Sequence, residues 1–137
     1  MNHFIRRLAA LLGLAVALLA GAPAGAQTAD DCLIKVRSAY PMDETIARIR
    51  QDIAAKGIMF FSAVDQQQLA AKAGITLRPS TLLSFGNPPL GAQFLSSNPY
   101  SGLDWPVRLL MLQDEAGVVW AAYTDFSWIA RRHGIKD

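Results

Sequence analysis

The chain has 137 residues, 52% of them hydrophobic and 18% charged, with a formal net charge of +2 at pH 7. This length suits one globular domain. Arg6 and Arg7 belong to an N-terminal segment that has the features of a cleaved signal peptide, described below. Without these two residues the 13 basic residues become 11, which equals the number of acidic residues. A neutral chain lacks the broad positive field that nucleic acid or an anionic membrane surface requires, so neither is expected as a partner.

The first 26 residues have the layout of a secretory signal peptide. Arg6 and Arg7 form a basic start, residues 8–20 form an apolar run, and Ala24 and Ala26 are the small residues of a cleavage site. The apolar run is too short to span a bilayer comfortably, although an uncleaved anchor helix is the alternative. We therefore expect cleavage after Ala26, a periplasmic or secreted location, and one mature domain over residues 27–137 that has no membrane segment.

The expected mature domain contains one cysteine, Cys32, and one histidine, His133. A single thiol cannot form an internal disulfide, so packing alone must stabilise the exported domain. Cys32 is expected to be a half-buried strand residue, with an intermolecular disulfide or a reactive thiol as the alternative. No metal site is predicted, because with one histidine and one cysteine a zinc site would have to take its remaining ligands from carboxylates, which is uncommon for structural zinc.

The first half of the mature chain predicts a strand, a helix and a second strand. Alternating apolar and polar residues predict a strand over residues 32–38. A helix is expected from Pro41 to Lys56, because apolar residues recur at helical spacing: Met42, Ile46, Ile49 and Ile53. The apolar residues 58–64 predict a strongly buried strand, and Asp65 with Gln68 predicts the capped start of a short helix over residues 66–73.

The most constrained segment of the chain is residues 77–89. Arg78-Pro79 precedes a strand expected at residues 81–85, and Gly86-Asn87-Pro88-Pro89 follows it. Residues 90–97 are expected to form a short helical turn or an irregular lid. None of these residues is a credible nucleophile or base, so we interpret the segment first as a folding device that can also shape a pocket.

The last third predicts a hairpin and a terminal helix. The hairpin joins residues 107–113 to residues 118–123 through a four-residue turn. Asp125 can cap a helix over residues 126–133, with Phe126, Ile129 and Ala130 turned inward. This element order predicts an α+β fold, a two-layer sandwich in which helices lie on one face of an antiparallel sheet.

Local signatures of known enzyme chemistry are absent from the sequence. There is no Gly-x-Ser-x-Gly, no Ser-x-x-Lys and no glycine-rich phosphate loop. Cys32 and His133 lie at opposite ends of the mature chain, so their spacing does not indicate a catalytic thiol–imidazole pair. His133 falls in the last turn of a helix, where a cation is favoured, and is expected to cap it, with a haem or metal ligand as the alternative.

Four polar residues are candidates for a ligand site near the two rigid turns. Arg78 needs an anionic partner, and Asp104 is the predicted one, with a ligand anion as the alternative. Asn87 is expected to be a turn residue whose amide can instead face a pocket. Tyr123 and Trp120 point to opposite faces of one strand, so one of them is expected in the core and the other in a cleft or interface.

The order of several short motifs resembles the domain of unknown function 302 family. The matching motifs cover about residues 36–135: Asp65 before an Ala-rich helix, Leu77-Arg78-Pro79-Ser80-Thr81-Leu82-Leu83, Phe85-Gly86-Asn87-Pro88, Asp104-Trp105-Pro106-Val107-Arg108, Trp120-x-x-Tyr123 and Arg132-His133-Gly134. The resemblance implies a fold similar to the TATA-binding-protein-like class, β-α-β4-α, with no implication of DNA binding. It also implies a tendency to form homodimers.

The chain departs from this family pattern at Gln66. Family members usually carry Asp-His where this chain has Asp65-Gln66. If the family's chemistry required that imidazole, this chain would be altered or inactive, whereas a binding role tolerates the change.

Taken together, the residues predict an exported, non-enzymatic domain that binds a small ligand or partner. The expected site is a cleft near residues 78–89, with these candidate residues: Arg78, Asn87, Asp104, Tyr123 and His133. One alternative is a hydrolase or isomerase that uses Asp65, Tyr123 or His133, and another is a structural homodimer module. The sequence names neither the ligand nor any cofactor.

Overall fold

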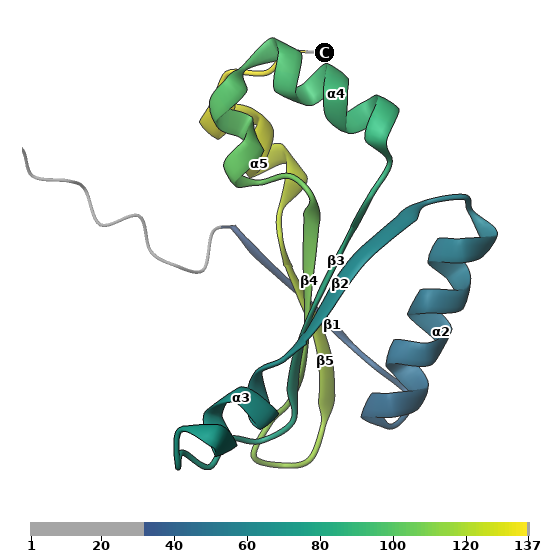
Figure 1. The fold of residues 1–137 in the computed structure, drawn as a ribbon, viewed down its shortest axis with the longest axis vertical. Coiled ribbons are helices and arrows are strands. Elements are labelled where there is room, and N and C mark those ends of the chain that lie inside the picture. Colours follow the sequence, from purple (N-terminus) through teal and green to yellow (C-terminus); the bar gives the residue numbers. More distant parts are fainter. Residues whose placement is uncertain (1–31, 137) are drawn as a thin grey trace, which may run out of the picture.

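The computed structural model describes residues 32–136. In chain order the elements are β1 (Leu33–Arg37), α2 (Met42–Ala55), β2 (Met59–Asp65), α3 (Gln66–Lys72), β3 (Ser80–Gly86), α4 (Pro88–Ser97), the 3-10 helix η1 (Pro99–Leu103), β4 (Val107–Gln113), β5 (Val119–Thr124) and α5 (Phe126–His133). The five strands form one antiparallel sheet in the order β1-β5-β4-β3-β2 (Figure 1). The predicted α+β fold with an antiparallel sheet is confirmed.

The expected signal peptide lies outside the described residues. Within residues 32–136, no helix is both long enough and apolar enough to cross a membrane.

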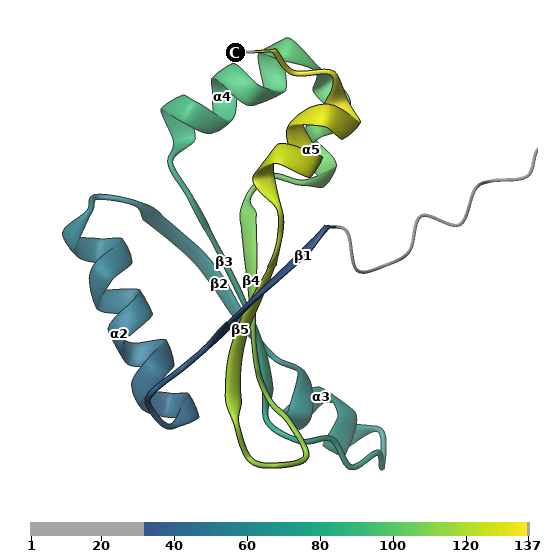
Figure 2. The same cartoon turned by 180° about the vertical axis from the view of Figure 1, so that it is seen from behind.

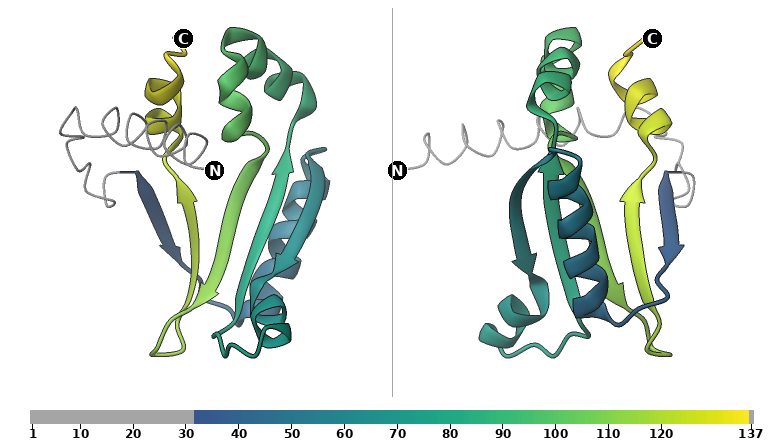
Figure 3. Two further views of the ribbon diagram at one scale, coloured as in Figure 1. Left: turned by 60° about the vertical axis from the view of Figure 1, so that its left-hand side comes forward. Right: turned by 90° about the vertical axis from the view of Figure 1, so that its right-hand side faces the viewer.

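The hydrophobic core lies between α2 and one face of the sheet (Figure 3). Met42, Ile46 and Ile49 of α2 pack against a cluster that includes Leu83 and Met111, which are both fully buried. Burial of a side chain of this size contributes about 1.5–3 kcal/mol, so the contact between α2 and the sheet stabilises the fold. The apolar stripe predicted for this helix is therefore confirmed.

The remaining helices lie at the two ends of the sheet (Figures 1 and 2). α3 lies at the end where β2 leads into β3, whereas α4, η1 and α5 gather at the opposite end. No helix of the described residues lies across the sheet face opposite α2 (Figure 3). The group formed by α4, η1 and α5, called the helical cap below, is the part of the fold that positions the candidate site.

The β4–β5 hairpin is closed by the side chain of Asp114. Its Oδ1 accepts hydrogen bonds from the backbone amides of Ala116 and Val118, each at 2.9 Å, and its Oδ2 accepts one from Trp120 Nε1 at 2.8 Å. The indole hydrogen bond is the largest cause that lowers the pKa of Asp114 below its ordinary value, followed by the amide of Val118. The predicted four-residue turn is thus fixed by one carboxylate.

Two predictions of burial are wrong. β2 was expected to be strongly buried, but it is an edge strand and every residue in it except half-buried Phe60 is exposed. An apolar run indicates hydrophobicity and cannot show that a strand will lie at the edge of the sheet. Phe126 was expected to point inward and is 55% exposed, whereas Ile129 on the same helix is buried.

Candidate functional site

The structure separates two of the predicted cleft residues, Arg78 and Asn87. Arg78 precedes β3 and forms an ion pair with Glu115 in the β4–β5 turn at 2.9 Å, whereas Asn87 follows β3 and caps α4. A seven-residue strand is about 23 Å long, so the two side chains lie at opposite ends of the sheet. The predicted Arg78–Asp104 pair is wrong, because the register of β3 with β4 places Arg78 beside the hairpin turn.

Asp104 is instead the acceptor at the centre of a basic cluster. Its side chain is 4% exposed and its carboxylate lies 2.6 Å from Nε2 of His133, 3.0 Å from Nη1 of Arg132 and 3.3 Å from Nη2 of Arg108. A buried carboxylate is costly unless charged and polar donors surround it, and this arrangement supplies three of them. His133 thus contacts a carboxylate with its ring, which differs from the helix-capping role expected from the sequence.

Asn98 holds this cluster in place by joining η1 to α5. Its Oδ1 accepts a hydrogen bond from the backbone amide of Tyr100 at 3.0 Å, and its Nδ2 donates to the carbonyl oxygen of His133 at 2.9 Å. Asp104 is the C-cap residue of η1, and its backbone amide donates a hydrogen bond to the carbonyl of Ser101. Asp104 and His133 are therefore fixed relative to each other although 29 residues separate them.

A cavity of about 500 Å³ lies beside the Asp104 cluster, lined by residues of α4, α5 and the start of β4. Its volume falls within the range of small-molecule sites. Its polar lining includes Asn87, Asp104 and Lys136. Apolar side chains form much of the rest of the wall: Leu90, Phe94, Trp105, Val107, Phe126, Ile129 and Ile135.

Trp105 forms one wall of this cavity and packs directly on two glycines. A Cβ atom at Gly91 would lie 2.1 Å from Cε2 of the indole, and one at Gly86 would lie 3.2 Å from its Nε1. Phe61 of β2 contacts the same indole edge-on, with ring centroids 5.8 Å apart. Gly91 thus permits an approach between α4 and the indole that no other residue allows.

A second cavity of about 20 Å³ adjoins the first. The two share these lining residues: Asp104, Val107, Phe126 and Ile129. The small cavity adds Arg108, Tyr123 and Thr124 to its wall. The structure therefore gathers four of the predicted site residues at the helical cap: Asn87, Asp104, Tyr123 and His133.

Three basic residues at this end were not identified from the sequence as site residues: Arg108, Arg132 and Lys136. Arg108 and Arg132 lie in two motifs shared with the family, close to the candidate residues Asp104 and His133. That position in the sequence could have identified both arginines as site residues. Lys136 follows the last helix and carried no such signal.

Asp65 and Gln66 lie away from this cluster. Asp65 ends β2 and caps α3 by accepting a hydrogen bond from the amide of Gln68 at 2.8 Å, while Gln66 accepts one from Ser80 at 2.7 Å. β3 and β4 lie between β2 and β5, the strand that carries Tyr123. The position at which family members usually have histidine is therefore not part of the helical cap. Within residues 32–136, no three His, Cys, Asp or Glu side chains are grouped so that they could hold a metal ion.

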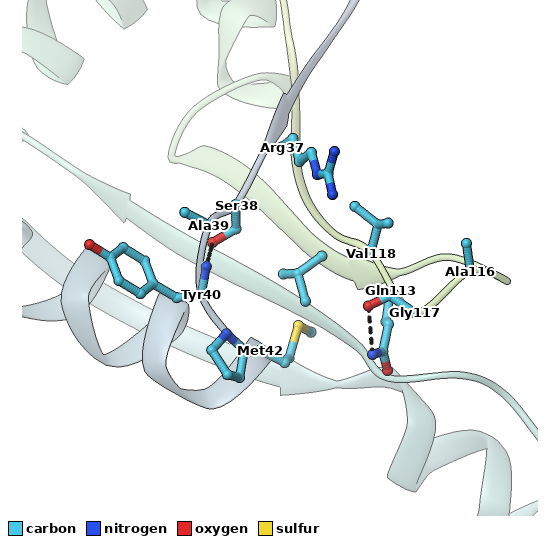
Figure 4. A pocket seen from close by; sticks show the side chains of 11 residues that line it. Arg37, Ser38, Ala39, Tyr40, Met42, Gln113, Ala116, Gly117 and Val118 are labelled. Carbon is cyan, nitrogen blue, oxygen red and sulfur yellow. Dashed lines mark hydrogen bonds between the residues drawn. The ribbon is translucent and has the colours of Figure 1, made fainter.

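Figure 4 shows another hollow, of about 520 Å³, where the β1–α2 connection meets the β4–β5 turn. Arg37 lies on its rim, and several of its polar groups bond to one another. Ser38 accepts a hydrogen bond from the amide of Tyr40 at 3.1 Å, and Gln113 donates one to the carbonyl of Gly117 at 3.0 Å. This hollow has one aromatic lining residue, Tyr40, whereas the cavity at the helical cap has three and is the stronger candidate site.

The fold and this site define a small α+β domain, an antiparallel sheet with one helix on its face and a helical cap at one end. The chain belongs to the DUF302 family, described as a domain of unknown function, whose pattern matches residues 34–137. The crystal structure of an uncharacterized conserved DUF302 protein from Bacillus stearothermophilus has a TM-score of 0.70 at 19% sequence identity. The similarity covers 76% of this chain and 81% of that one, and it shows the shared fold.

The chain is also similar to part of two proteins named as fluoride-specific ion channels. Fluoride-specific ion channel FluC 1 of Brucella suis biovar 1 (strain 1330) is 35% identical over 113 residues, which cover 82% of this chain and 44% of the channel protein. Fluoride-specific ion channel FluC 2 of Brucella melitensis biotype 1 (strain ATCC 23456 / CCUG 17765 / NCTC 10094 / 16M) is 35% identical over 113 residues, 42% of its length. The chain thus spans less than half the length of these relatives.

Proposed function

We propose that this protein is an exported domain that binds a small, largely apolar molecule in the cavity at the helical cap. The observation that carries this proposal is the cavity of about 500 Å³ with three aromatic side chains in its wall: Phe94, Trp105 and Phe126. Apolar walls with a few polar groups are typical of small-molecule sites. Asp104 is the one carboxylate among the described lining residues. It already contacts the side chains of Arg108, Arg132 and His133, so its role is to fix the wall of the cavity.

The enzyme alternative has less support from this geometry. Asp65 lies in β2 and does not meet Tyr123 or His133, so the three residues do not form one set. The contact between His133 and Asp104 is a buried pair in a basic cluster, and among residues 32–136 the ring of His133 has no hydrogen bond to a hydroxyl or thiol group.

Binding of N-phenyl-1-naphthylamine, an uncharged apolar dye, tests the proposal. The dye is expected to gain fluorescence with the purified protein, and Leu90→Glu is expected to weaken its binding about tenfold by placing a charge on the cavity wall. Leu69→Glu on α3 is the matched control, since Leu90 and Leu69 are 65% and 53% exposed and neither change should unfold the protein. No dye binding, or equal losses in both variants, would refute the proposal.

A second candidate function rests on the FluC relatives. In those proteins the part similar to this chain makes up less than half of a fluoride-specific ion channel. We propose that this domain acts beside a separate fluoride channel as an accessory domain. Fluoride flux through a reconstituted FluC channel, measured with and without the purified domain, tests this; an unchanged flux at saturating domain would refute it.

The homodimer implied by the family resemblance is also part of the proposal. β2 presents an exposed edge whose one charged residue, Asp65, lies at its end, whereas the opposite edge strand β1 carries Lys35 and Arg37. Charged residues protect a sheet edge from pairing, so β2 is the edge suited to pair with a second copy.

A further inference from the structure

We infer that the ligand of the cavity at the helical cap carries a carboxylate, which binds beside Arg108 while the apolar part of the molecule fills the larger cavity. This inference rests on the proposed function and adds the chemical class of the ligand: an apolar molecule with one anionic end.

The relation between the two cavities is the first reason. They have walls in common at Asp104, Val107, Phe126 and Ile129, and the smaller one adds the side chains of Arg108 and Tyr123. A volume of about 20 Å³ suits a group of one or two heavy atoms, because one water molecule needs about 10–15 Å³ by the same kind of measure. One oxygen of an anionic group fits there, and a planar carboxylate leaves less of itself outside the small cavity than a tetrahedral phosphate does.

The balance of charge is the second reason. Arg108 and Arg132 both bond to Asp104, and Lys136 lines the larger cavity, so three cations accompany one buried carboxylate. Asp125 at the start of α5 adds a second carboxylate, which caps the helix by accepting a hydrogen bond from the amide of Ser127 at 2.8 Å, so the three cations still outnumber the two carboxylates. The field at this end therefore favours an anion over a cation.

The geometry of Arg108 is the third reason. Its Nη2 donates to Oδ1 of Asp104 and to the carbonyl of Leu103 at 3.2 Å. A guanidinium carries five N–H donors, and those on Nε and Nη1 have no acceptor among the described residues. Asp104 holds the guanidinium at the wall of the small cavity, and 54% of the side chain is exposed, so the remaining donors are accessible to a ligand.

The same contacts argue against an amine as the ligand's polar end. An ammonium group would need the oxygens of Asp104, which already accept from Arg108, Arg132 and His133. It would also lie close to two guanidinium groups, and like charges at this range repel.

Calorimetric titration with four ligands of equal chain length tests the inference: octanoate, octan-1-ol, octylamine and octyl phosphate. Octanoate is expected to bind about threefold to fivefold more tightly than octan-1-ol, as one partly exposed ion pair allows, and octylamine more weakly than both. The preference for octanoate should fall at high salt. Octyl phosphate is expected to bind more weakly than octanoate, and the reverse order would overturn the assignment of a carboxylate.

Charge variants separate a site at Arg108 from a general field. Arg108→Gln is expected to bring octanoate to within about twofold of octan-1-ol, and Arg108→Lys to retain part of the preference. Arg131→Gln is the matched control, because Arg131 bonds to Ser127 on α5 and lines neither cavity. Equal losses in Arg108→Gln and Arg131→Gln would overturn the inference.

Failure of the inference can be distinguished from failure of the proposed function. If octanoate, octan-1-ol and octylamine bind equally well, the anionic preference is refuted and the apolar site stands. If none of them binds, and N-phenyl-1-naphthylamine does not bind either, both are refuted.

Discussion

At the scale of single residues, Asp104 has the largest structural role of the candidate site residues. Its buried carboxylate contacts one side chain from β4 and two from α5, and so joins segments that the helical cap must hold together. The sequence indicated that Asp104 would need a cationic partner, but it could not show which arginines the fold would bring to it.

We expect Asp104→Asn to lower the free energy of unfolding by about 2–3 kcal/mol, because it leaves Arg132 and His133 beside a neutral amide at a buried position. Urea denaturation followed by circular dichroism measures the change. Glu44→Gln is the control, since it removes an exposed pair with Arg48 on α2 and should cost less than about 0.5 kcal/mol. Equal losses would show that the Asp104 cluster contributes no more than a surface pair.

Gly91 offers a residue-scale test in which sterics oppose helix propensity. Replacing a glycine inside a helix by alanine ordinarily stabilises by about 0.5–1 kcal/mol. At Gly91 the new Cβ would lie 2.1 Å from Trp105, so we expect Gly91→Ala to destabilise by about 1–3 kcal/mol instead. Thermal unfolding of Gly91→Ala in the wild-type and Trp105→Phe backgrounds measures the coupling; a loss of the same size in both would contradict the contact.

At the scale of elements, the sequence predicted what short-range chemistry determines. The stripe of α2, the cap of α5 by Asp125 and the turn between β4 and β5 all depend on residues within a few positions of one another. The position of β2 at the sheet edge and the pairing of Arg78 with Glu115 depend on strand order and register, and local periodicity contains neither. The same limit applies to the candidate site. The sequence indicated which residue types could bind a ligand, but it did not show that Arg78 and Asn87 lie at opposite ends of β3.

The hairpin turn gives a prediction on pH dependence. Because hydrogen bonds lower the pKa of Asp114 in the folded protein, its carboxylate contributes stability that is present above the unfolded pKa of about 3.9 and is lost as the pH falls through the folded pKa. We expect Asp114→Asn to be less stable than wild type at neutral pH, with the difference shrinking below about pH 4. Acid-induced unfolding of the two proteins measures this.

Trp120→Phe provides the matching check, since it removes the largest cause of the shift while keeping an aromatic ring. The pKa of Asp114, followed by carbon-13 NMR of its carboxyl group, should then rise toward its ordinary value. An unchanged titration midpoint would contradict the role assigned to the indole.

At the scale of the whole molecule, the uncovered sheet face and the exposed edge strand β2 are the features that a second copy would protect. Several apolar residues of the two edge strands are exposed, Val64 at 37% and Val36 at 52% among them. Monomeric proteins rarely leave a long apolar edge open, because it promotes association.

We expect Val64→Lys to shift the purified protein from dimer to monomer, because a charged side chain on β2 opposes pairing of two copies. Analytical ultracentrifugation measures the association state. Val36→Lys introduces the same change on β1, at the other edge of the sheet, and should leave the dimer intact. A wild-type monomer at all concentrations would refute the dimer, and loss of the dimer in Val36→Lys alone would place the interface at β1.

The helical cap extends beyond the layer formed by α2 and the sheet, and it joins that layer through the ends of β3, β4 and β5 (Figures 1 and 3). Parts of a protein that lie outside the main core can open without global unfolding. Amides of α4 and α5 should therefore exchange with deuterium faster than those at the centres of β3 and β4, and N-phenyl-1-naphthylamine should slow exchange in the cap alone. Uniform exchange across both regions would contradict this. If the cap opens without the core, ligand binding appears as slower exchange confined to α4, η1 and α5, which contain 10, 5 and 8 residues, while exchange in the core stays unchanged.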